Sequence, residues 1–138
     1  MFKNMITVTT KINSPIEKVW DYWTNPIHIV NWNNASDDWH TPKAENDLKV
    51  NGTFRYTMAA KDGSFSFDFW GVYTHIEKFK NIEFTLGDER KVKISFTKNE
   101  SDVLITESFD AESTNSEELQ RNGWQAILNN FKKYVEKN

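Results

Sequence analysis

Cysteine is absent from the 138 residues of the chain, and this absence removes several kinds of chemistry at once. Without thiols the chain forms no disulfide, uses no thiol nucleophile and offers no thiolate to a metal ion. A chain without cysteine is also compatible with a reducing compartment, and we expect a cytoplasmic protein.

Glycine and histidine are scarce as well. The five glycines form neither GxGxxG nor a phosphate-binding loop, and no G-x-S-x-G elbow is present. The three histidines, His28, His40 and His75, make no HxxxH or HxH pair, and Asp37-Asp38 beside His40 is the nearest approach to a ligand cluster. The sequence therefore predicts no catalytic residues, no metal site and no cofactor.

Basic blocks and long hydrophobic runs are also missing. The net charge is −3, and both signs are mixed along the chain. This distribution lacks the basic stripe that binds nucleic acid and the basic amphipathic stretch that binds a membrane surface. The opening MFKNMITVTT alternates polar and apolar residues, which predicts neither a signal peptide nor a transmembrane helix. We expect no nucleic-acid partner and no membrane insertion.

Aromatic residues, in contrast, are abundant. They make up 14% of a chain whose hydrophobic fraction is only 38%, so they must supply much of the buried area. The length is typical of a single domain, which we expect to span residues 1–138. Four of the six tryptophans fall in one stretch, SPIEKVWDYWTNPIHIVNWNNASDDWH: Trp20, Trp23, Trp32 and Trp39.

The N-terminal third reads as one strand followed by two short helices. Alternation over residues 6–12 predicts the strand. Ser14 and Glu17 have the spacing of a capping box, with Pro15 at the first helical position, and this helix should run to about Trp23. Asn25-Pro26 ends it and begins a second helix through about Trp32. The polar residues 33–47 read as a loop.

Period-two patterns then recur up to Phe109, with a hairpin signal at Asp62-Gly63. Short polar turns between the runs predict antiparallel neighbours. The expected strands cover residues 54–58, 65–76, 82–86, 92–96 and 103–109. Asn115 or Ser116 can cap a final helix, in which Gly123 indicates close packing or a bend. Its apolar stripe comprises Trp124, Ile127, Leu128, Phe131 and Val135. The fold class is α+β, with this helix lying across a curved sheet.

Three segments, in this order, resemble a known family: INSPIEKVWDYWTNPIHIVNW, NGTFRYTM with DGSFSFDFWGVYTHIE, and GWQAILNNFKKYVE. They resemble the START-like (SRPBCC, helix-grip) superfamily and, within it, the homology family of the heat-shock-protein-90 ATPase activator C-terminal domain. The resemblance implies six or seven antiparallel strands wrapped around the C-terminal helix, two short helices after the first strand, and a cavity for a hydrophobic or amphipathic molecule.

Three functions follow as hypotheses, because a shared fold does not choose among them. The first is binding of a hydrophobic or aromatic small molecule between sheet and helix. The second is a cochaperone-like module whose partner is a chaperone or another protein. The third is a cyclase- or hydrolase-type enzyme that acts inside the cavity.

The residues that we expect to line the cavity follow from strand parity and from the tryptophans. Glu107 shares parity with Val103, Ile105 and Phe109, so it should point inward, whereas Arg55 and Asp68 should face solvent. Trp20 and Trp23 read as structural anchors, and Trp39 should fold back over the open end of the domain. Glu107 or Tyr73 would orient the ligand. The expected ligand-binding residues are Trp32, Trp39, Phe54, Tyr56, Phe67, Phe69, Tyr73, Glu107, Trp124 and Leu128.

Overall fold

The computed structural model describes residues 5–138, in which seven antiparallel strands form one sheet in the order β1-β7-β6-β5-β4-β3-β2. The strands are β1 (Met5–Ile12), β2 (Trp39–Asn46), β3 (Thr53–Ala60), β4 (Ser66–Glu77), β5 (Asn81–Leu86), β6 (Lys91–Lys98) and β7 (Val103–Asp110). The helices are α1 (Ile16–Thr24), α2 (Pro26–Trp32) and α3 (Glu117–Lys137).

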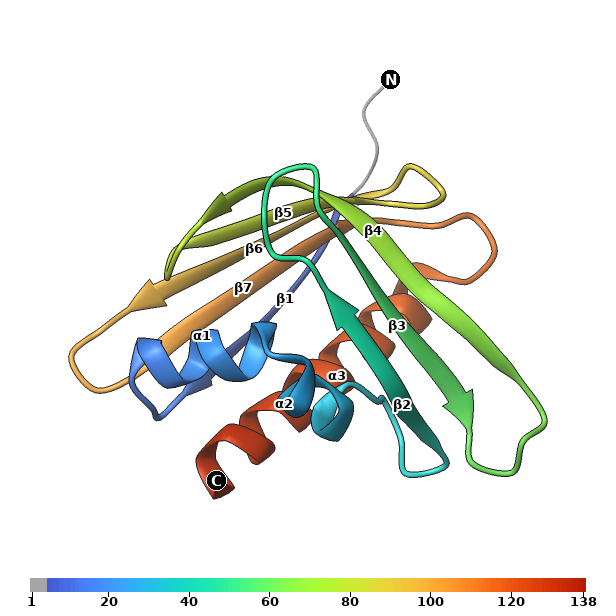
Figure 1. The fold of residues 1–138 in the computed structure, drawn as a ribbon, viewed down its shortest axis with the longest axis horizontal. Coiled ribbons are helices and arrows are strands. Elements are labelled where there is room, and N and C mark those ends of the chain that lie inside the picture. Colours follow the sequence, from blue (N-terminus) through green and yellow to red (C-terminus); the bar gives the residue numbers. More distant parts are fainter. Residues whose placement is uncertain (1–4) are drawn as a thin grey trace.

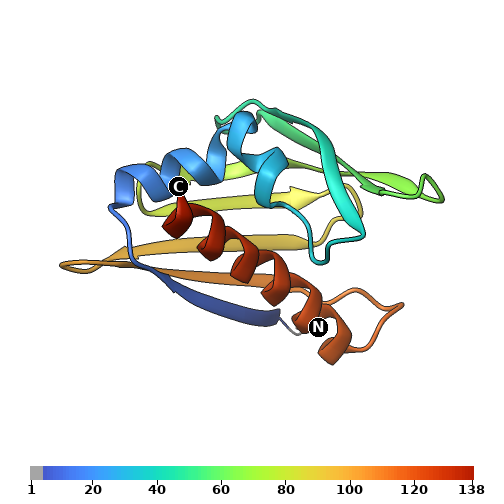
Figure 2. The same ribbon diagram turned by 90° about the horizontal axis from the view of Figure 1, so that it is seen from below.

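The sheet curves around α3, as Figure 1 shows, and the three helices lie on its concave side. Seen from below in Figure 2, α3 crosses the sheet diagonally while α1 and α2 cover one end. This arrangement confirms the expected α+β helix-grip fold. No helix within residues 5–138 is both long enough and apolar enough to cross a membrane.

The N-terminal elements confirm the expected order but not the expected cap. In β1, Ile6, Val8 and Ile12 are buried, as the alternation predicts. Helix α1 begins one residue after Pro15, which occupies the N-cap with extended backbone and makes no side-chain cap hydrogen bond. The predicted Ser14 capping box is therefore wrong, because Ser14 lies one position before the cap. Helix α2 does have a side-chain cap, since the Asn25 side chain accepts from the Ile27 N–H.

Residues 33–47 are not a continuous loop, which corrects a second expectation. Residues 39–46 form β2, which pairs with β3 at one edge of the sheet. The pairing register shifts between His40 and Lys43, where Thr41 and Pro42 interrupt the ladder. An edge strand tolerates such a bulge and a proline because one of its sides needs no partner.

Helix α3 contributes a stripe of buried residues to the hydrophobic core. The Ser116 side chain caps it by accepting from the Leu119 N–H at 3.1 Å, as expected. Leu128, Phe131 and Val135 are fully buried along one stripe. Gly123 is not closely packed, which removes the first of the two alternatives expected for it: a Cβ atom built there meets no atom within 4 Å. The glycine therefore borders open space.

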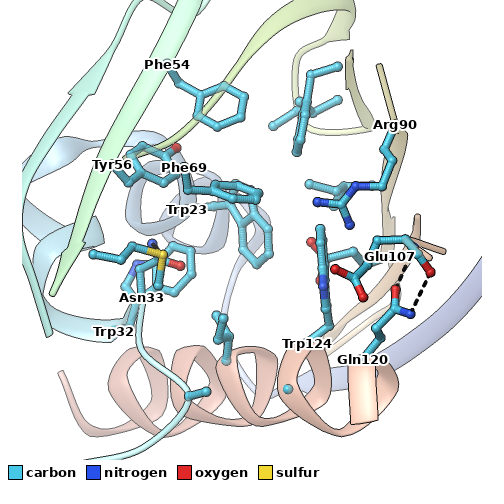
Figure 3. Close-up of a pocket in the computed structure, with 18 of the residues that line it drawn as sticks. Trp23, Trp32, Asn33, Phe54, Tyr56, Phe69, Arg90, Glu107, Gln120 and Trp124 are labelled. Carbon is cyan, nitrogen blue, oxygen red and sulfur yellow. Dashed lines mark hydrogen bonds between the residues drawn. The ribbon is translucent and has the colours of Figure 1, made fainter. Parts of the chain in front are cut away.

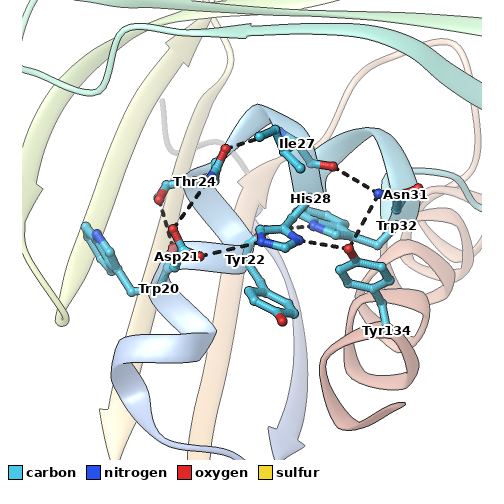
Figure 4. Close-up of polar contacts among 10 residues, drawn as sticks. Trp20, Asp21, Tyr22, Thr24, Ile27, His28, Asn31, Trp32 and Tyr134 are labelled. Atoms are coloured by element: carbon cyan, nitrogen blue, oxygen red, sulfur yellow. Dashed lines mark hydrogen bonds and ion pairs between the residues drawn. The ribbon is translucent and has the colours of Figure 1, made fainter. Parts of the chain in front are cut away.

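A polar network joins the two short helices to the end of α3 (Figure 4). His28 Nδ1 shares a hydrogen bond of 2.8 Å with the Tyr134 hydroxyl, and its Nε2 lies 3.6 Å from a carboxylate oxygen of Asp21. The His28 ring also stacks on Tyr22, with 3.8 Å between centroids. The Trp32 indole N–H donates to the Tyr22 carbonyl at 2.8 Å. These contacts fix the end wall of the domain.

Candidate functional site

A cavity of about 350 Å³ lies between the concave face of the sheet and the helices. Side chains from most elements of the fold line it (Figure 3). Those from the helices and the α2–β2 connection are Trp23, Thr24, Trp32, Asn33, Ala35, Leu119, Gln120, Gly123, Trp124 and Ile127. Those from the sheet and its turns are Phe54, Tyr56, Met58, Phe67, Phe69, Tyr73, Ile82, Phe84, Arg90, Ile94, Glu107, Glu112 and Asn115.

The end of the cavity under α1 and α2 is built from interlocked rings. The Trp23 ring centroid lies 5.0 Å from that of Trp32 and 4.9 Å from that of Phe131. Trp32 also meets Phe131 edge-on at 4.8 Å. Because Phe131 is fully buried, it holds both indoles in place from behind. This end wall is apolar and rigidly supported.

The sheet and α3 contribute further aromatic walls. Phe54 of β3 is buried and contacts Phe84 of β5 edge-on at 4.7 Å and Phe69 of β4 at 5.8 Å. On the opposite side, Trp124 of α3 stacks flat on Phe109 of β7, with 3.9 Å between centroids and 11° between planes. The stacked pair fixes the Trp124 indole as one face of the cavity.

Glu107 is a buried carboxyl group on β7, with 7% of its surface exposed. It points into the cavity, as its parity with the buried residues of β7 predicts. Burial raises the pKa of Glu107 from its ordinary 4.5 to about 8, because the charged form would lose its hydration. The group is therefore mostly protonated at neutral pH. A protonated carboxyl both donates and accepts hydrogen bonds.

Arg90 enters the cavity from the turn between β5 and β6. The Leu86 N–H donates to the Arg90 carbonyl at 2.8 Å, which closes this turn. The Arg90 Nε donates to a carboxylate oxygen of Asp88 at 2.7 Å, and 21% of the Arg90 side chain is exposed. Arg90 and Glu107 thus bring a cation and a neutral acid to the same cavity.

The β7–α3 connection is held in shape by one glutamine. The Gln120 amide oxygen accepts from the Glu112 N–H at 2.8 Å, and its NH₂ donates to the carbonyls of Glu112 and Asn115. Gln120 is buried, and these bonds satisfy its amide. The loop therefore closes the same end of the cavity that Glu107 and Arg90 line.

Two tyrosines place hydroxyl groups near the opposite end. Burial raises the pKa of Tyr56 well above its ordinary value and also raises the pKa of Tyr73, so both remain neutral. The Tyr73 hydroxyl donates to the Asn46 side-chain oxygen, and the Asn46 NH₂ donates to the Thr24 carbonyl at 2.7 Å. This chain of bonds ties β4 through β2 to α1.

The structure brings nearly all of the expected ligand-binding residues together at this cavity. Trp32, Phe54, Tyr56, Phe67, Phe69, Tyr73, Glu107 and Trp124 line it. Leu128 does not line it and instead packs within the hydrophobic core. Trp39 does not either: its ring lies about 6 Å from those of Phe65 and Phe67, beside the β3–β4 hairpin. Arg55 and Asp68 face solvent, as expected, and form an ion pair of 2.9 Å.

Sequence reasoning missed several lining residues. Trp23 reads as a structural anchor because its spacing from Trp20 is helical, yet it lines the cavity whereas Trp20 contacts Phe79 and Phe96. Arg90 lies in a polar turn that resembles any solvent-exposed hairpin. No local signal distinguishes an arginine that turns inward from one that does not.

The histidines are spread over the fold. His28 joins the network of Figure 4, whereas His40 and His75 lie exposed on β2 and β4. Within residues 5–138, no three His, Asp or Glu side chains gather in a way that could hold a metal ion.

Comparison with known proteins agrees with this architecture. The family model described as "Activator of Hsp90 ATPase homolog 1-like protein" matches residues 13–136. A search of curated proteins gave no match. Two solution structures are similar over 96% of this chain. The AHSA1-like protein of Aeromonas hydrophila is 42% identical, with a TM-score of 0.88 over 93% of its own length. The protein Chr148 of Cytophaga hutchinsonii is 57% identical, with a TM-score of 0.84 over 92% of its length.

A more distant structure shares the fold alone. The protein CV1439 of Chromobacterium violaceum is 19% identical, with a TM-score of 0.87, and the match covers 98% of this chain and 99% of that one. The family match covers all of the residues that line the cavity. The chain belongs to the activator of Hsp90 ATPase homolog 1-like family, within the START-like helix-grip superfamily.

Proposed function

We propose that the protein binds an apolar or aromatic small molecule in the cavity between the sheet and α3. One observation carries this proposal: a cavity of about 350 Å³ is lined mainly by apolar side chains, nine of them aromatic, and contacts with other rings fix several of these nine. Cavities of small-molecule sites usually fall between about 300 and 1,000 Å³ and combine apolar walls with a few polar groups. This cavity has both properties.

The driving force is removal of apolar ligand surface from water. Each 100 Å² of such surface contributes about 2.5 kcal/mol. A preformed wall adds to this, because Trp23, Trp32 and Trp124 already pack against neighbouring rings and lose little freedom on binding. Glu107 supplies a hydrogen-bonding group that fixes the orientation of the ligand.

Phe67 and Leu119 mark the place where the cavity meets the surface. Both side chains line the cavity, and both are exposed, Phe67 at 43% and Leu119 at 59%. They come from β4 and from the first turn of α3. A ligand can therefore reach the cavity beside either residue.

Binding is better supported than catalysis. Among residues 5–138, no hydrogen-bonded partner contributes to the raised pKa of Glu107, so this carboxyl group is not part of a preassembled acid–base pair. The cochaperone hypothesis is supported only by the description of the family. Neither alternative has a structural feature comparable with the cavity.

The test uses the neutral fluorescent probe N-phenyl-1-naphthylamine and a variant that fills the cavity. Gly123 lines the cavity, and a Cβ there meets nothing within 4 Å, so Gly123→Leu should project into the lumen without a clash. Replacing a helical glycine should also stabilise α3, by up to about 1 kcal/mol. We expect Gly123→Leu to weaken probe binding about tenfold or more while the melting temperature stays level or rises.

The matched control is Asn122→Leu, which adds the same side chain to an exposed position of α3 next to Gly123. This variant should bind the probe like the wild-type protein. Equal probe affinity in the two leucine variants would place the probe outside the cavity. Failure of the wild-type protein to bind at all would remove the proposal for aromatic ligands of this size.

A further inference from the structure

The polar side chains that carry a cation, a carboxyl group or a buried amide gather on one side of the cavity, beside Trp124. Arg90, Glu107 and Gln120 come from the β5–β6 turn, β7 and the start of α3, and they lie on one side in Figure 3. The rings of Phe54 and Trp23 lie on the other side. The sheet order explains the separation, because β6, β5 and β4 lie between β7 and β3.

Arg90 brings unused hydrogen-bond donors to this side of the cavity. Its Nε donates to Asp88, but no residue among 5–138 accepts a hydrogen bond from its terminal nitrogens. Only 21% of the Arg90 side chain is exposed to solvent, although the guanidinium is permanently charged. A planar guanidinium with free N–H groups is the side chain best matched to a carboxylate.

Glu107 adds a second unused donor. Its carboxyl group lines the cavity, and no hydrogen bond with a residue among 5–138 contributes to its raised pKa. Because burial raises the pKa of Glu107 to about 8, the group carries a proton at neutral pH and does not repel an anion. Arg90 and Glu107 form no ion pair with each other, so both can contact a ligand.

We propose that this side of the cavity is a headgroup site for an organic carboxylate, so that the ligand is an aromatic or aliphatic carboxylic acid held by Arg90 and Glu107. This inference rests on the proposed function of the cavity and specifies its ligand class. The apolar body of the acid lies among the aromatic side chains, and the carboxylate accepts hydrogen bonds from the guanidinium and from the protonated carboxyl group.

The other titratable groups around Glu107 do not compete for this role. Glu112, from the β7–α3 loop, has one carboxylate oxygen accepting from the Asn115 N–H. Tyr56 of β3 and Tyr73 of β4 are neutral because burial raises their pKa values. The residues of α1, α2, α3, β5 and β6 that line the cavity carry no titratable group, and β1 contributes no lining residue. Within residues 5–138, Arg90 is therefore the cation of the cavity.

The test compares three ligands that share one ring system and differ in charge: 2-naphthoate, 2-naphthamide and 2-naphthylmethylammonium. Calorimetric titration near neutral pH should give 2-naphthoate the highest affinity, by about tenfold over the neutral amide, as a charge-assisted hydrogen bond provides. Arg90→Met should remove this preference and reduce naphthoate binding to the level of the amide. The matched control is Arg55→Met, which removes an arginine on the outer face of the sheet.

The pH dependence provides a second readout. In the wild-type protein, naphthoate affinity should fall about tenfold per pH unit once the pH exceeds the Glu107 pKa of about 8, because an ionised carboxylate repels the ligand. Glu107→Gln cannot ionise, so its naphthoate affinity should show no such fall over the same pH range. The amide should bind with little pH dependence to the wild-type protein.

The possible outcomes distinguish failure of the proposed carboxylate site from failure of the proposed ligand cavity. Equal binding of all three ligands would overturn the carboxylate site and leave the proposed function standing. Preference for the ammonium ligand, with loss of that preference in Glu107→Gln, would also overturn it and would show that Glu107 acts as a counter-ion. Absence of binding by all three, and by N-phenyl-1-naphthylamine, would remove both proposals.

Discussion

Replacing Glu107 with glutamine should change how the stability of the protein depends on pH. The pKa of Glu107 is about 8 in the folded protein, against an ordinary value of 4.5. Between these values the folded state holds a proton that the unfolded chain has released. The free energy of unfolding should therefore fall by about 1.4 kcal/mol per pH unit as the pH rises through this interval.

The size of the effect follows from the width of the interval. The stabilising contribution is fully present below pH 4.5 and is lost as the pH rises through about 8. Across the whole interval the loss amounts to about 5 kcal/mol, a large share of the 5–15 kcal/mol that stabilises a typical domain. Glutamine has nearly the same shape and no charge, so Glu107→Gln should abolish this slope.

Other shifted carboxylates act in a different pH range. The pKa values of Asp62, Asp68 and Glu136 are lowered, chiefly by hydrogen bonds to Ser64, Arg55 and the Asn13 N–H respectively. Their contributions are present above their ordinary pKa values and are lost only as the pH falls below them. They therefore do not produce the predicted slope between pH 4.5 and 8.

The assay is urea unfolding, followed by tryptophan fluorescence, at one-unit steps from about pH 5 to about pH 9. The wild-type protein and Glu107→Gln should diverge as the pH rises, with glutamine the more stable at the alkaline end. Glu100→Gln, which removes an exposed carboxylate from the β6–β7 turn, is the control and should follow the wild-type curve. Parallel curves for the wild-type protein and Glu107→Gln would refute the assignment of a buried, protonated Glu107.

Two further substitutions test the surroundings of the cavity. Trp39→Ala should leave the affinity for N-phenyl-1-naphthylamine within about twofold, because the ring packs beside Phe65 and Phe67 outside the cavity; a tenfold loss would contradict this placement. Tyr134→Phe removes the hydroxyl that bonds His28 and should lower the free energy of unfolding by about 1 kcal/mol, as measured in urea. An unchanged urea midpoint would show that the bond between the Tyr134 hydroxyl and His28 does not stabilise the fold.

The sequence predicts most of the fold because the periodic signals are local. Alternation places β1 and β3 to β7, and the apolar stripe places α3. The sequence does not predict strand β2, because this edge strand is polar and contains Pro42 at a bulge. It therefore lacks the alternation of apolar and polar residues, and its pairing with β3 is interrupted. The predicted start of α1 is wrong by a single position. Ser14 has the residue type and spacing of an N-cap, but Pro15 occupies that position in the structure.

The sequence predicts a cavity-lining residue only where that residue lies on a strand and alternates with solvent-facing neighbours. Glu107 points inward for the same reason as its buried neighbours on β7, so parity alone finds it. Trp23 and Arg90 depend on tertiary placement: which face of a short helix meets the cavity, and which way a turn side chain bends. Gly123 shows the same limit, because the cost of glycine in a helix does not reveal whether close packing or empty space surrounds it.

The positions of the tryptophans allow the central claim to be tested in one spectrum. Three of the six line the cavity, namely Trp23, Trp32 and Trp124. The other three pack elsewhere: Trp20 against Phe96, Trp39 beside Phe65, and Trp70 beneath Arg55 on the outer face.

The measurement is a titration of ¹⁵N-labelled protein with N-phenyl-1-naphthylamine, following the six assigned indole N–H resonances. Binding in the cavity predicts large shifts for the three lining tryptophans and small shifts for the others. Shifts confined to Trp39 and Trp70, or no shifts at probe saturation, would contradict the claim that the space between the sheet and α3 is a ligand site.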